Sequence, residues 1–71
     1  MSVPVVRKDA KNILRKIRKD NGLTIVELAH LMNLGSSAAL SNIEYGTNNF
    51  TLEKAFLAAD ALNVSVNVFL Q

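Results

Sequence analysis

Few residues of this 71-residue chain are suited to catalysis or metal binding. The chain has no cysteine and a single histidine, His30, so a structural zinc site is excluded. Glu27 lies three residues before His30, but a pair at this spacing is more typical of a helix surface than of an acid–base site. The glycines are scattered and form no phosphate-binding loop. We therefore expect no enzyme, no cofactor and no small-molecule ligand.

The basic residues offer a different chemistry, the recognition of a polyanion. The formal net charge is only +2, yet seven of the eight lysines and arginines precede Gly22. This asymmetry fits a polyanionic partner or a self-docking interface, and it also fits the solvated face of a helix. The seven residues are Arg7, Lys8, Lys11, Arg15, Lys16, Arg18 and Lys19.

The chain is too small to bury a large core. A domain of this size buries only about 60% of the surface that its unfolded chain exposes. Nevertheless 49% of the residues are hydrophobic, and the mean hydropathy is +0.18. We expect some of this apolar surface to contact a partner, with oligomerisation as a means of stabilisation.

The sequence shows no segment for a membrane or for export. No apolar run approaches the roughly 18–20 residues that span a bilayer, and no signal peptide is recognisable, which predicts a cytoplasmic protein.

Hydrophobic periodicity predicts short helices joined by turns. Residues 1–6 contain the only proline and are expected to form a flexible arm. A single domain is expected over residues 7–71. Within it, apolar residues at i, i+3 and i+4 spacing predict a first helix over residues 7–21, which Gly22 ends. A capping box at Thr24 predicts the start of a second helix.

Polar caps and a glycine define where the next two helices begin and end. Ser36 or Ser37 is suited to cap a third helix that Gly46 ends, and Thr51 is suited to cap a fourth. The tail is ambiguous. Residues 64–68 alternate with period two, which favours a strand, whereas a cap at Ser65 would begin a single helical turn.

A set of spaced residues resembles the lambda-repressor-like family, the Cro/CI or Xre-type helix-turn-helix regulators of phages and bacteria. The resemblance covers roughly residues 12–70. It implies an all-α, compact five-helix domain with a short helix near residues 66–70. The matching residues are Leu14-x-x-Ile17-Arg18-x-x-x-Gly22-Leu23-Thr24-x-x-Glu27-Leu28-Ala29, Leu40-Ser41-x-Ile43-Glu44-x-Gly46, Leu52-Glu53 and Leu62-x-Val64-Ser65.

The family resemblance implies a structural role for Arg18 and Glu44. Matching residues in the family form a partly buried ion pair that holds the first helix against the recognition unit, and a guanidinium suits a carboxylate bidentately. The alternative is two unrelated surface charges. Ala29 is expected where the second and third helices cross closely, because its small side chain permits that approach.

The resemblance also implies binding of double-stranded DNA by the third helix in the major groove. The spacing from Ala29 to Glu44 is one residue longer than usual, and we place the extra residue near residues 33–35. Among the base-facing residues, Asn42 is the one suited to a bidentate contact with adenine. Counting back from Glu44, these residues are Ser36, Ser37, Ala38, Ser41 and Asn42.

Contacts with the DNA backbone are expected to be sparse. Ile25 stands where the family often has a phosphate-binding glutamine, and residues 47–50 lack the usual basic residue followed by proline. The backbone contacts that we expect come from Lys8, Lys11, Thr24, Asn48 and Asn49.

Two functions follow from this pattern. One is a dimeric, sequence-specific repressor whose homodimer forms through Leu57, Val66 and Val68. The other is a helix-turn-helix module used for protein contact, as in an antirepressor or an antitoxin. The apolar second helix and the uncharged recognition helix support this second function.

Overall fold

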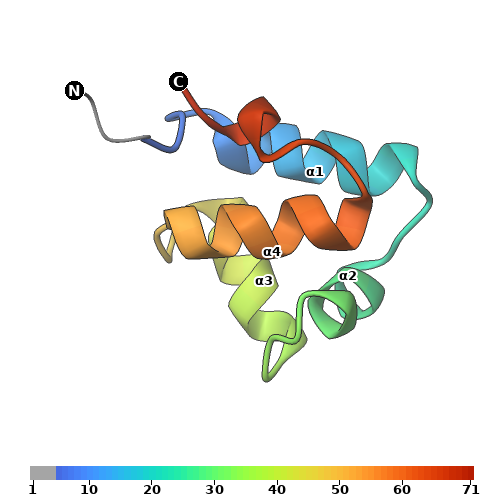
Figure 1. Cartoon of the computed structure of the whole chain (residues 1–71). Coiled ribbons are helices and arrows are strands. Elements are labelled where there is room, and N and C mark those ends of the chain that lie inside the picture. Colours follow the sequence, from blue (N-terminus) through green and yellow to red (C-terminus); the bar gives the residue numbers. More distant parts are fainter. Residues whose placement is uncertain (1–4) are drawn as a thin grey trace.

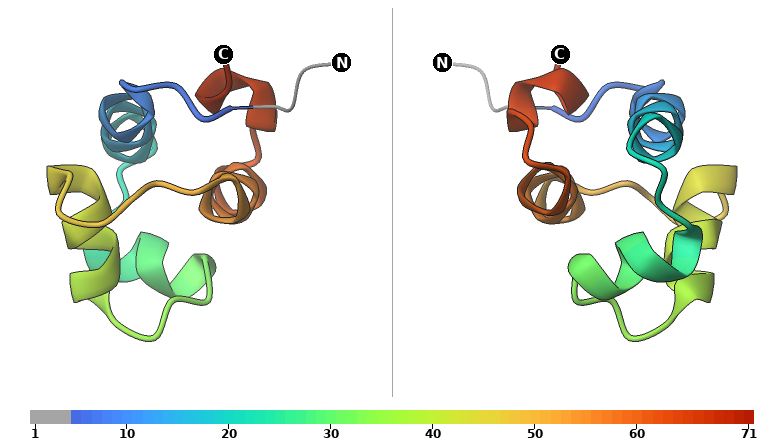
Figure 2. Two further views of the ribbon diagram at one scale, coloured as in Figure 1. Left: turned by 90° about the vertical axis from the view of Figure 1, so that its left-hand side faces the viewer. Right: turned by 90° about the vertical axis from the view of Figure 1, so that its right-hand side faces the viewer.

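Four α-helices and a terminal 3-10 helix make up the computed structural model, which describes residues 5–71. The helices α1 and η1 lie at one end of the molecule, and α2 lies at the other (Figures 1 and 2). The helix α4 crosses the middle of the view in Figure 1, and Figure 2 shows that α3 and α4 lie on opposite sides of the molecule. The elements are α1 (Ala10–Asp20), α2 (Ile25–Leu31), α3 (Ser37–Tyr45), α4 (Leu52–Leu62) and η1 (Val66–Phe69).

The predicted caps of α2, α3 and α4 are confirmed. The hydroxyls of Thr24, Ser36 and Thr51 each accept the backbone N–H three residues further along the chain. Such caps satisfy donors that the first turn of a helix leaves without a partner. Gly46 ends α3 in the left-handed conformation at φ +83°, which an L-residue adopts only with strain.

Two expectations about the helices need correction. The helix α1 begins at Ala10 rather than at residue 7, because Arg7 and Asp9 form a turn before it. The tail does not form the strand that its alternation favoured. The alternative, a single helical turn that begins with a cap at Ser65, is confirmed, although this turn is a 3-10 helix and not a fifth α-helix. Val66–Phe69 is a single 3-10 turn, which Ser65 caps, and the chain is extended again at Leu70. The family-based count of five α-helices is therefore not met.

The two ends of the described chain lie side by side. Val6 and Leu70 form an antiparallel β-bridge, and the Arg7 N–H donates to the Phe69 carbonyl at 2.8 Å. The Gln71 N–H donates to the Val5 carbonyl at 2.9 Å. Residues 1–4 of the expected flexible arm lie outside the described residues. Val5 and Val6 are held against the C-terminus.

The core is built from the faces that the helices turn inward. Phe69 of the C-terminal tail is fully buried in this core, and its ring packs against that of Phe50 with centroids 5.3 Å apart. Ile25 is half-buried against this core, whereas Leu31 is 54% exposed and does not belong to it. The largest fully buried apolar side chains are those of Leu14, Leu28, Met32, Leu40 and Phe69.

Candidate nucleic-acid interface

The helices α2 and α3 form a helix-turn-helix unit. Between them, Asn33 takes the left-handed conformation at φ 61°, and the Leu34 N–H donates to the Ala29 carbonyl at 2.9 Å. Ala29 itself is 3% exposed. The hydroxyl of Ser36 then accepts the Ala39 N–H and marks the start of α3. The cap therefore places the first residue of α3 at Ser37.

The outer face of α3 is mainly polar and uncharged. Leu40, Ile43 and Glu44 are buried, so the opposite face of the helix points to solvent. Ser36 and Ala38 on that side are exposed. The remaining expected base-facing residues, Ser37, Ser41 and Asn42, are half-buried.

Tyr45 extends this outer face and is not among the residues that the sequence pattern predicted to face DNA. It follows Ser41 by four residues and Ala38 by seven, which are spacings of one helical face. Its side chain is 71% exposed, the largest value among the exposed large hydrophobic residues of the described chain. The signal in the sequence is the aromatic residue itself within the Ile43-Glu44-x-Gly46 motif, a motif that otherwise indicates only the end of a helix.

Arg18 and Glu44 form a bidentate ion pair between α1 and α3. Arg18 Nε donates to Glu44 Oε2 at 2.7 Å, and the second fork nitrogen donates to Oε1 at 3.1 Å. The third guanidinium nitrogen donates to the Leu23 carbonyl at 2.9 Å. Arg18 is 8% exposed and Glu44 only 2%. The pair is thus withdrawn from water and has its hydrogen bonds satisfied, the condition under which a buried charge is tolerated.

Arg15 adds a second link between the same helices. Its guanidinium donates to the Glu44 carbonyl, and its Nε lies 3.5 Å from Glu44 Oε1. It also stacks over the Tyr45 ring, 5.3 Å from the centroid, in a cation–π arrangement. Arg15 therefore holds Tyr45 at the edge of the outer face. A spacing of three residues from Arg18 was the signal that both arginines face α3.

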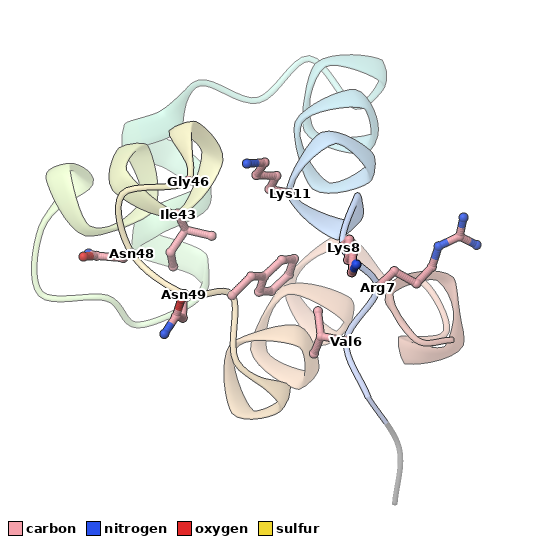
Figure 3. Close-up of a pocket in the computed structure, with 9 residues that line it drawn as sticks. Val6, Arg7, Lys8, Lys11, Ile43, Gly46, Asn48 and Asn49 are labelled. Carbon is pink, nitrogen blue, oxygen red and sulfur yellow. The ribbon is translucent and has the colours of Figure 1, made fainter.

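A cavity of about 310 Å³ opens between the start of α1 and the loop that follows α3 (Figure 3). It brings together four of the five expected backbone contacts, Lys8, Lys11, Asn48 and Asn49. The rest of the lining is Val6, Arg7, Ile43, Gly46 and Phe50.

Thr24, the fifth expected backbone contact, does not line this cavity. Its hydroxyl accepts the Glu27 N–H, and its own N–H donates to Glu27 Oε1 at 2.9 Å. This backbone hydrogen bond to the carboxylate holds the pKa of Glu27 below its usual value. The polar groups of Thr24 are therefore engaged in the cap of α2.

Arg7 lines the cavity with a guanidinium that already has a partner. It forms two hydrogen bonds with the Asp9 carboxylate, at 2.9 and 3.2 Å. These bonds raise the pKa of Arg7 and lower the pKa of Asp9. In Figure 3 the Arg7 side chain points away from the other lining residues. Lys8 and Lys11 are thus the cations that face the space.

The residues expected at the dimer interface differ in their exposure. Leu57 and Val66 are half-buried and pack against the core. Val68 is 36% exposed, and on α4 the side chain of Phe56 is 54% exposed. Within residues 5–71 there is no cluster of side chains that could hold a metal ion, and no helix is long and apolar enough to cross a membrane.

Comparisons with known proteins place the chain among helix-turn-helix proteins. A family model described as helix-turn-helix matches residues 14–69. The crystal structure of the clp gene regulator ClgR from C. glutamicum is 32% identical with a TM-score of 0.79, covering 93% of this chain and 84% of its own. A mutant of the restriction–modification controller protein C.Esp1396I is 34% identical with a TM-score of 0.78, covering 86% and 78%. No curated protein matches the chain.

Proposed function

Because the chain belongs to the Cro/CI or Xre-type helix-turn-helix family of DNA-binding transcriptional regulators, we propose that it is a sequence-specific, dimeric repressor of phage or bacterial type. It acts on cytoplasmic DNA and inserts α3 into the major groove. A clp gene regulator and a restriction–modification controller protein among its structural relatives support this proposal.

One observation carries the proposal: the outer face of α3 and the lysine-lined cavity are joined. The Asn48 N–H donates to the Asn42 carbonyl at 3.1 Å, so the loop that borders the cavity is tied to the expected base-facing residue. A DNA-binding surface needs one set of groups that reads bases and another that positions the backbone. Asn42 and the two lysines supply these two sets at adjoining places.

The proposed base readout is narrow. Asn42 is able to bond adenine N6 and N7 bidentately, Ser37 and Ser41 to contact either base type, and Ala38 to meet a thymine methyl group. No charged side chain stands among the expected base-facing residues. The exposed phenol of Tyr45 adds a fifth group at the end of this face.

We further propose a homodimer formed through η1 and the adjoining part of α4, using Val68 with the exposed edges of Leu57 and Val66. Two recognition helices would then meet half-sites about one helical turn apart. Val68→Glu should shift the sedimentation of the chain toward the monomer and weaken operator binding, because it places a charge in an apolar contact. An unchanged association constant would remove this surface from the proposal.

A second candidate function, protein contact through α2, has its own supporting observation. Val26 and Leu31 on this helix are 65% and 54% exposed. A gel-shift titration against duplexes selected from random sequence, repeated at several salt concentrations, separates the two functions. Specific retention with a marked salt dependence supports the regulator, since backbone contacts release counterions. No retention on any selected duplex supports the protein-binding module.

A further inference from the structure

We propose that the outer face of α4 is a docking surface for the outer face of α1 of a second copy of this chain. The charge asymmetry of the sequence fits such self-docking as well as it fits a polyanion. Of the seven basic residues that precede Gly22, Lys16 and Lys19 have no role in the ion pair with Glu44 or in the proposed DNA contacts. The inference does not rest on the DNA-binding function.

The outer face of α4 carries two carboxylates around an exposed aromatic ring. Glu53, Phe56 and Asp60 follow one another at spacings of three and four residues, which places them on one side of the helix. All three are exposed, and Phe56 is 54% exposed. Within residues 5–71, neither carboxylate forms an ion pair. A large ring between two carboxylates suits a cation with an aliphatic stem.

The outer face of α1 offers such cations at a matching spacing. Asn12, Lys16 and Lys19 are exposed and share one side of the helix, at spacings of four and three residues. Neither lysine forms an ion pair with another residue of the described chain. Each set extends over about 10 Å of helix, and the order of the two spacings is reversed between the sets. Two antiparallel helices therefore align the sets residue by residue.

The antiparallel alignment gives every side chain of one set a suitable partner in the other. The middle pair is a cation–π contact, and the outer pairs are an ion pair and a hydrogen bond from an amide to a carboxylate. With the residue of α1 named first, the pairs are Lys19 with Glu53, Lys16 with Phe56 and Asn12 with Asp60.

The position of Asp20 favours this direction over a parallel one. This exposed carboxylate follows Lys19 and lies at the end of α1. In the antiparallel alignment it comes toward the N-terminal end of α4 of the second copy, where the helix dipole attracts an anion. In a parallel alignment it would come toward the C-terminal end of α4, where the dipole repels an anion.

The contact is separate from the homodimer surface proposed above. Leu57 of that surface lies about 100° around α4 from Phe56. Because α1 and α4 bury their inner faces in one core, their outer faces do not meet within one chain. A contact between two different faces leaves one of each open on the joined copies, so association can continue beyond two copies.

Sedimentation velocity of the full chain without DNA tests this contact. When the salt concentration is lowered from about 1 M to about 0.1 M, the Debye length rises from ~3 to ~10 Å, and the chain should shift reversibly toward larger species. Phe56→Ala and Lys19→Glu should each weaken this association about tenfold, because they remove an aromatic anchor and reverse one charge of an ion pair. Lys54→Glu is the matched control, since it makes the same change of charge at a position of α4 outside the contact. It should leave the association unweakened.

An exchange of charges tests the pairing itself. Lys19→Glu and Glu53→Lys should each associate weakly alone, whereas a mixture of the two variants should associate again, because each then offers the charge that the other requires. Val68→Glu should keep the salt-dependent association, which distinguishes it from the homodimer. Association that does not depend on salt, or a mixture that stays dissociated, overturns the contact and leaves the α4 face to a basic partner of another sequence. The proposed DNA-binding function stands in either case.

Discussion

Arg18 and Lys11 are cations on the same face of α1, seven residues apart, yet their surroundings are opposite. Arg18 is 8% exposed and donates to both oxygens of Glu44. Lys11 is half-buried and faces a cavity whose described lining contains no carboxylate. One helix face thus carries one cation whose charge is satisfied within the fold and another whose charge is available to a ligand. The position of Glu44 on α3 determines that Arg18, and not Lys11, has a carboxylate partner within the fold.

Removing one partner of the Arg18–Glu44 ion pair should have the largest effect on stability. In Glu44→Gln, Arg18 stays buried without a counter-charge, which for buried pairs costs ~3–5 kcal/mol of unfolding free energy. Thermal and chemical denaturation measure this loss, with the exposed Glu53→Gln as the control. A melting temperature within about 2 °C of the parent would show that the pair does not stabilise the fold, because 1 kcal/mol corresponds to about 4–8 °C in a domain of this size.

Two glycine variants test the placement of Lys11 in the cavity. Gly46 and Gly22 both have positive φ, at +83° and +69°, so alanine at either position should cost ~1–2 kcal/mol of stability. Only at Gly46 would the new Cβ meet a side chain, that of Lys11. Gly46→Ala should therefore also weaken binding to non-specific DNA, measured by fluorescence anisotropy, whereas Gly22→Ala should not. Equal binding by both variants would contradict the placement of Lys11.

The smallest effect is expected at Glu27, an exposed carboxylate in contrast to buried Glu44. Its pKa in the folded chain lies below the ordinary value of 4.5, because the Thr24 N–H donates to it. The stabilisation that it provides is therefore present above pH 4.5 and is lost as the pH falls through the folded pKa. Glu27→Gln keeps the hydrogen-bonding group without titrating. The melting temperature of the parent should fall relative to this variant under acid conditions, and parallel melting curves across the pH range would contradict the cap.

Local sequence was sufficient to predict most of the fold. Thr24, Ser36, Thr51 and Gly46 act on backbone groups within a few residues of themselves, so their types and spacing define helix ends. The predicted first helix began too early, because the turn that Arg7 and Asp9 form before Ala10 is held by a bond from the Arg7 N–H to the Phe69 carbonyl. That partner is remote in the sequence, and no local pattern reveals it.

The candidate site was predicted only in part, because it too depends on contacts between residues that are remote in the sequence. Lys8 and Lys11 stood out as charges, but only the folded chain shows that they share a cavity with Asn48 and Asn49. The importance of Tyr45 depends on Arg15, which reaches it from another helix. Contacts between elements determine these features.

We propose that α3 reads bases while residues that line the cavity contact the DNA backbone, and a comparison of two variants separates these two roles. Sequence-selection profiles and salt titrations are measured for Asn42→Ala and Lys11→Gln. Asn42→Ala should lose ~1–3 kcal/mol of discrimination at one base pair with non-specific binding unchanged. Lys11→Gln should weaken all sequences alike and reduce the salt slope by about one unit. If Asn42→Ala preserves every position of the selected site, or Lys11→Gln changes which base is preferred, the division between the two surfaces is contradicted.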